Sequence, residues 1–64
     1  MKEIRNLIES FFKLAEGLKI DSEEKYEVIM SVCSIQANLS FEVTSRGENE
    51  VKKELTSYID YIKK

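Results

Sequence analysis

The chain has 64 residues, of which 42% are hydrophobic and 34% charged, and its formal net charge is −2. A chain of this length forms one domain at most, over residues 1–64, and buries only about 60% of the surface that its unfolded form exposes. Because acidic and basic residues are interleaved, no overall basic field attracts nucleic acid, and a dominant phosphate-binding role is disfavoured.

Domains of this size usually need a disulfide, a metal or self-association for stability. Cys33 is the only cysteine, so no disulfide can form within the chain. The sequence has no histidine, which leaves too few ligands for a structural zinc site. We therefore predict no metal and no cofactor, and we expect a homo-oligomer, most simply a dimer.

No membrane-spanning or secretory segment is expected from the sequence. No run approaches the roughly 20 apolar residues that a membrane span requires. Lys2, Glu3 and Arg5 interrupt any apolar region that could act as a signal peptide. We therefore expect a cytoplasmic protein without a membrane partner.

The first predicted helix covers residues 2–16. Its apolar residues recur at helical spacing and form one face: Ile4, Leu7, Ile8, Phe11, Leu14, Ala15 and Leu18. Phe12 lies at the edge of this face, where it is either half-buried or part of a second contact surface. Gly17 is predicted to close the helix in the left-handed conformation. The short connection over residues 17–20 predicts that the first two helices are antiparallel neighbours.

The second predicted helix covers residues 22–45, with Asp21 or Ser22 as its N-cap; Asp21 would place Glu24 in a capping box. It is too apolar for a helix with one buried face. One stripe is predicted to pack against the other two helices: Val28, Ile29, Val32, Ile35, Leu39 and Val43. A second stripe has no evident partner in the chain and is predicted to face another chain: Tyr26, Met30, Cys33, Ala37 and Phe41.

The end of this helix has an alternative interpretation. Residues 39–44 alternate apolar and polar and are rich in strand-forming residues, so a short strand there would make the fold α+β. We favour a helix because Leu39 and Val43 continue the first stripe and Phe41 continues the second. A lone strand would also need a partner strand from a second subunit.

The third predicted helix follows a turn at Gly47, begins near Glu48 or Asn49, and has Asn49 as its expected N-cap. Its apolar stripe consists of Val51, Leu55, Tyr58 and Ile62, with Ile59 and Tyr61 on the flanks. The sequence therefore predicts an all-α fold, a three-helix antiparallel bundle with a long central helix that forms a dimer.

No residue pattern indicates an enzyme. Without histidine, the commonest general base is missing, and the carboxylate pairs Glu23/Glu27 and Glu50/Glu54 lie on faces predicted to be solvated. Cys33 has no neighbouring basic residue to stabilise a thiolate, so it is interpreted as a small apolar residue or as an intermolecular disulfide at a dimer axis.

The predicted function is a non-enzymatic helical protein–protein interaction module, such as a regulator, adaptor or inhibitor, that self-associates through its central helix. The predicted interface is Tyr26, Met30, Cys33, Ala37, Phe41, Phe12 and Tyr61. A phage or mobile-element inhibitor of a host enzyme, with a different protein as partner, is one alternative. A small nucleic-acid-binding transcriptional regulator is the other, through the basic cluster Arg46, Lys52, Lys53, Lys63 and Lys64.

Overall fold

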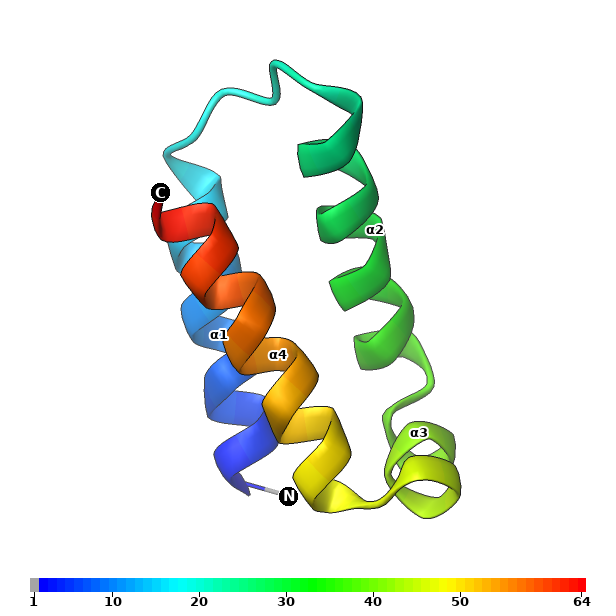
Figure 1. The fold of residues 1–64 in the computed structure, drawn as a ribbon. Helices are drawn as coiled ribbons and strands as arrows, with labels where there is room; N and C mark the ends of the chain where they lie inside the picture. Colours follow the sequence, from blue (N-terminus) through cyan, green and yellow to red (C-terminus); the bar gives the residue numbers. More distant parts are fainter. Residues whose placement is uncertain (1) are drawn as a thin grey trace.

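The computed structural model describes residues 2–64, which fold into helices joined by short connections. Four helices occur within these residues: α1 (Lys2–Glu16), α2 (Glu23–Ala37), α3 (Leu39–Arg46) and α4 (Glu48–Lys63). The helices α1 and α4 run side by side in the same direction, and α2 runs antiparallel to both (Figure 1). The short helix α3 joins α2 to α4 at the end opposite the α1–α2 connection (Figure 1). The all-α prediction is confirmed, whereas the described chain has four helices where three were expected.

Asn38 divides the predicted central helix into α2 and α3. Its backbone leaves the helical region at φ −120° and ψ 36°, while its N–H still donates to the Ser34 carbonyl at 3.1 Å. The side-chain amide of Asn38 donates to the same carbonyl at 3.3 Å. Asparagine suits such a break because its side chain competes for nearby backbone groups. Residues 39–44 lie within α3, so the strand alternative is wrong and the preference for helix is confirmed.

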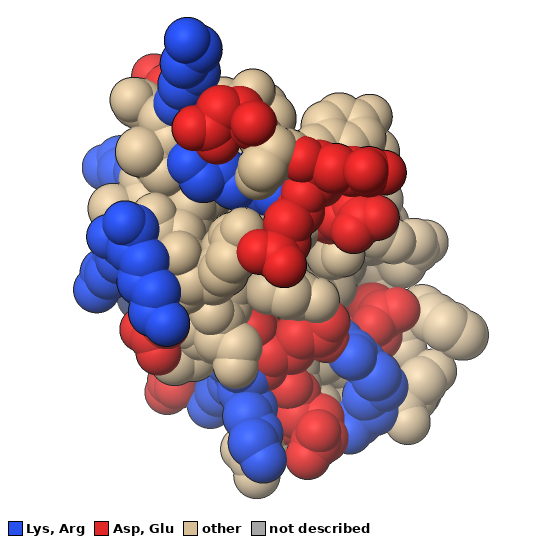
Figure 2. All heavy atoms as spheres, turned by 45° about the horizontal axis from the view of Figure 1, so that its top comes forward, with Lys and Arg blue, Asp and Glu red and all other residues tan. Residues whose placement is uncertain are grey.

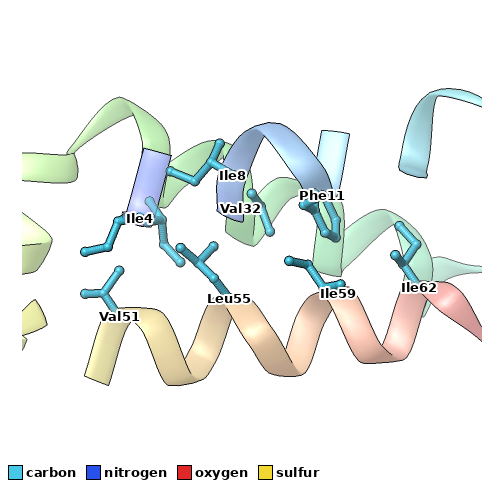
Figure 3. Packing of buried hydrophobic residues seen from close by; sticks show 9 residues of the cluster. Ile4, Ile8, Phe11, Val32, Val51, Leu55, Ile59 and Ile62 are labelled. Carbon is cyan, nitrogen blue, oxygen red and sulfur yellow. The ribbon is translucent and has the colours of Figure 1, made fainter. Parts of the chain in front are cut away.

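The buried core lies mainly between α1 and α4, and α2 closes its third side (Figure 3). Its members are Ile4, Ile8 and Phe11 of α1, Val32 and Ile35 of α2, and Val51, Leu55, Ile59 and Ile62 of α4. The stripe of the second predicted helix that was expected to pack against the other helices contributes four further residues. They lie half-buried against this core: Val28, Ile29, Leu39 and Val43. The prediction that this stripe holds the other helices is therefore confirmed.

The helix ends agree only partly with expectation. Ser22 caps α2 by accepting a hydrogen bond from the Lys25 N–H at 3.2 Å, so the capping box expected for Asp21 does not form. Gly17 does not take the predicted left-handed conformation, and α1 ends instead in a turn in which the Leu18 N–H donates to the Ala15 carbonyl.

Gly47 is the glycine with positive φ among the described residues, at φ 88° and ψ 150°. It is the only residue between α3 and α4, so the chain changes direction there within a single residue. Gly47 also stands at the N-cap of α4, and Asn49, expected to be that cap, lies inside the helix. None of the helices described here has the length and apolar character required to cross a membrane.

Candidate interaction surface

The outward side of α2 carries large apolar side chains that the core does not cover. Tyr26 and Met30 expose 53% and 49% of their surface, Ala37 is exposed and Cys33 is half-buried. These four residues recur at helical spacing on one side of α2, which we call the α2 outer face. Exposed apolar groups gathered on one face mark contact sites more often than scattered ones do. The expectation that the second stripe lacks a partner within the chain is met by Tyr26, Met30 and Ala37.

Phe41 continues this stripe in the sequence but stands on a separate helix. It lies in α3, beyond the break at Asn38, and is the most exposed large apolar side chain described, at 68%. Because the axis changes direction at Asn38, Phe41 does not extend the α2 outer face as one straight stripe (Figure 1). Phe41 is therefore a separate exposed apolar side chain, at the end of the molecule where α3 lies.

The other two predicted interface residues make contacts within the chain. The Phe12 ring meets Phe11 edge to face, with ring centroids 5.5 Å apart, and packs half-buried against the core. The Tyr61 hydroxyl donates to Glu24 Oε1 at 2.6 Å, which joins α4 to the first turn of α2. This hydrogen bond raises the pKa of Tyr61. Tyr61 therefore links α4 to α2. Phe12 lines a different surface, which is described below.

The orientation of Phe41 depends on how α3 is held, because α3 has no fully buried side chain. Arg46 at its C-terminal end pairs with Glu42 in the same helix, Nε to Oε1 at 3.0 Å, and with Glu54 of α4. The Arg46 guanidinium meets Glu54 Oε1, a buried atom for which this ion pair is the partner. The Tyr58 hydroxyl donates to the other Glu54 oxygen at 2.5 Å.

The charge on Glu54 is stabilised by its two partners. Burial raises the pKa of Glu54, but the hydrogen bond from Tyr58 and the Arg46 guanidinium lower it by more, so the pKa lies below its ordinary value. The same hydrogen bond, together with burial, raises the pKa of Tyr58. The carboxylate thus stays ionised and ties α3 to α4.

Glu54→Gln is expected to lower the free energy of unfolding by about 1 kcal/mol at neutral pH, because it removes the charged link between α3 and α4. The lowered pKa means that this contribution is complete above the unfolded-state carboxyl pKa of about 4.3 and disappears as pH falls through the folded-state pKa. Urea denaturation at pH 7 and at acidic pH should show a difference between wild type and variant that shrinks in acid. Asp60→Asn, an exposed change on α4, is the control; equal losses in both variants would contradict the assignment.

The basic cluster considered for nucleic acid is partly neutralised within the chain. Arg46 is paired as described, and Lys52 Nζ lies 2.9 Å from Glu3 Oε2, a contact that raises the pKa of Lys52 and lowers that of Glu3. Lys53 and Lys63 are ten positions apart on α4, or about 15 Å along its axis. Acidic and basic side chains lie next to one another across the face shown in Figure 2. The basic residues Arg46, Lys52, Lys53, Lys63 and Lys64 therefore do not act as one patch of free charge.

A second surface feature is a groove of about 620 Å³ between α1 and the α2–α3 junction. Its α1 side consists of Arg5, Ile8, Glu9, Phe12, Lys13 and Glu16. Gln36 and Leu39 line it from α2 and α3. We call it the α1 groove. Ile8 is buried and Phe12 half-buried, whereas the four charged residues are exposed. The charges are evident in the sequence, but the groove is not, because its far side depends on the bend at Asn38.

Metal-ligating side chains and the thiol of Cys33 are further candidate functional groups among the described residues. No group of three or more histidine, cysteine, aspartate or glutamate side chains within residues 2–64 is placed to hold a metal ion. Cys33 is a free, half-buried thiol. Comparison of the chain with protein-family models, with curated proteins and with solved structures finds no match. Functional inference therefore starts from the two surfaces, the α2 outer face and the α1 groove.

Proposed function

We propose that the protein is a non-enzymatic helical interaction module that self-associates through the α2 outer face. The observation that carries this proposal is the exposure of Tyr26 and Met30 on one side of α2. The opposite side of α2 is already buried in the core through Val32 and Ile35. A small domain has little apolar surface to spare, because its own core is limited by size. Covering these side chains with a second copy would remove them from water and add stability.

The residue sizes along α2 favour an antiparallel, two-fold symmetric arrangement. The α2 outer face reads large, large, small, small in the order Tyr26, Met30, Cys33, Ala37. When a second α2 packs antiparallel, Tyr26 falls opposite Ala37 of the second copy and Met30 opposite Cys33. Large side chains then meet small ones, as close packing requires. A parallel arrangement would place Tyr26 on Tyr26 and leave the small residues without a filling neighbour.

Charged groups beside the α2 outer face are compatible with this arrangement. Glu23 and Glu27 are exposed on one flank of α2. The register that places Tyr26 opposite Ala37 brings Glu23 and Glu27 level with Ser40 and Gln36 of the second copy, both neutral, so no two carboxylates are forced together. Such a two-fold contact uses the same patch on both chains and closes without leaving a free surface for further growth at this face.

Met30→Glu is expected to weaken this association by at least about a hundredfold, because two carboxylates would have to be buried at the centre of the contact. Sedimentation equilibrium over a concentration series measures the effect. Glu27→Lys changes charge on the same helix but lies on the flank, so it should leave association nearly unchanged. Wild-type protein that stays monomeric throughout, with circular dichroism of a folded helical chain, would contradict the proposal.

A further inference from the structure

We propose that the α1 groove is a second self-association site, in which α1 of one copy packs antiparallel to α1 of another. The site is separate from the α2 outer face and does not depend on it. Its basis is the order of charge along α1, where Arg5, Glu9, Lys13 and Glu16 alternate in sign beside the groove. Among the described residues none of these four side chains makes an ion pair.

The alternating charges of two α1 helices pair with opposite charges only when the two helices run antiparallel. With a two-fold axis close to residues 10 and 11 of each chain, Arg5 falls opposite Glu16 of the second copy, and Glu9 falls within one residue of Lys13. The symmetry repeats both pairs, so all eight charges meet an opposite charge. These residues lie on one flank of the groove, and in an antiparallel pair equivalent flanks face each other. Shifting either helix by one turn replaces attraction with like-charge contacts.

The apolar part of the groove lies where the two helices would cross. Phe12 is close to the two-fold axis, so the Phe12 rings of the two copies are offset by only about 4 Å along the helix direction. Each ring can enter the partner's groove between its Phe12 and Leu39. Aromatic pairs of this kind supply attraction beyond the area that they bury. The rings therefore provide the affinity, and the exposed charges fix direction and register.

The apolar side chains Phe12 and Leu39 of this contact are already half-buried, so less exposed apolar surface is left to cover here than on the α2 outer face. Contacts of limited area are weak and transient, so association through the α1 groove should need higher protein concentration than association through α2. Because exposed charges are screened by salt, it should also weaken as ionic strength rises. Wild-type protein is then expected to pass from dimers to larger species as concentration increases.

A charge-reversal pair tests the α1 groove without relying on the α2 contact. All proteins carry Met30→Glu, so that any remaining association comes from elsewhere. Glu9→Lys and Lys13→Glu should each reduce that association by at least about tenfold, because each places two like-charge pairs across the two-fold axis. An equimolar mixture of the two variants should associate again, since the introduced lysine of one chain then meets the introduced glutamate of the other. Isotopic labelling of one variant identifies the mixed species by mass spectrometry.

The experiment with mixed variants distinguishes a contact between two chains from an effect on the stability of α1 within one chain. A change in the stability of α1 itself would persist in the mixture, and circular dichroism of each variant checks that it remains folded. Asp60→Lys, an exposed charge reversal on α4, is the control and should not change association. The proposal is overturned if the Met30→Glu protein is monomeric at every concentration, or if the mixture associates no better than either variant alone. Neither result bears on the α2 contact, which the comparison of wild type with Met30→Glu decides.

Discussion

Leu55→Ala is expected to leave most of the protein unfolded at room temperature. Leu55 is fully buried in the middle of the apolar stripe of α4, between Val51 and Ile59. Replacing a buried leucine with alanine costs about 2–5 kcal/mol, through lost burial and the cavity left behind. The core of a chain below about 70–80 residues rarely supplies more than about 3–5 kcal/mol in total. The expected loss is therefore comparable to the whole stability of the domain.

Leu18→Ala provides a matched control, because the same side-chain atoms are removed at a position that is 42% exposed and outside the helices. Its effect should stay within about 0.5 kcal/mol. Urea denaturation followed by circular dichroism measures both variants, at one fixed protein concentration because self-association adds to apparent stability. Similar midpoints for Leu55→Ala and wild type would show that the α1–α4 core does not determine stability.

Gly47→Ala is expected to cost about 1–3 kcal/mol, the second largest effect of a single substitution considered for this chain. At φ 88° and ψ 150°, Gly47 occupies a region of backbone space that is essentially restricted to glycine. No atom lies within 4 Å of where a Cβ would stand, so the cost arises from the backbone and not from a steric contact with neighbouring residues.

Gly17→Ala is the control for this effect. Gly17 likewise has no atom within 4 Å of a built Cβ, but its φ is not positive. Alanine restricts the unfolded chain, so Gly17→Ala should be neutral or stabilise the protein by up to about 1 kcal/mol. Thermal and urea denaturation of the two variants give opposite signs if the backbone argument is right. Equal effects at the two glycines would contradict it.

The helices and the core follow closely from the pattern of apolar residues. The spacing of Ile4, Ile8 and Phe11, and of Val51, Leu55 and Ile62, is sufficient to identify the faces that meet in the structure. The break at Asn38 does not follow, because the apolar period continues through it without glycine or proline. Beyond the break, Leu39 and Val43 pack against the core, and this tertiary contact is not recorded in the local sequence.

The two glycines show the same distinction between local and tertiary causes. Each follows a helix, and each has the sequence context of a helix-ending residue. Six residues connect α1 to α2, so the chain can turn gradually, and Gly17 needs no unusual conformation. A single residue, Gly47, connects α3 to α4, and it takes a positive φ. The two glycines therefore differ because the connections that hold them differ in length.

The sequence predicts the candidate surface only where all of its residues lie on one helix. Exposure of Tyr26 and Met30 follows from their place on the helical wheel of α2, opposite Val32 and Ile35. Tyr61, predicted to share their interface, donates a hydrogen bond to Glu24, 37 positions away, and no local pattern reveals this bond. The α1 groove escapes prediction for the same reason, since its lining comes from three helices.

The packing of α1 against α4 also has a consequence for how the chain is made. Because α1 leaves the ribosome before α4, the apolar face formed by Ile4, Ile8 and Phe11 lacks its main cover until α4 has emerged. The core between α1 and α4 can therefore form only after α4 has emerged. A chain interrupted before α4 would lack four of the nine described core residues, Val51, Leu55, Ile59 and Ile62, and is expected to be a substrate for proteolysis.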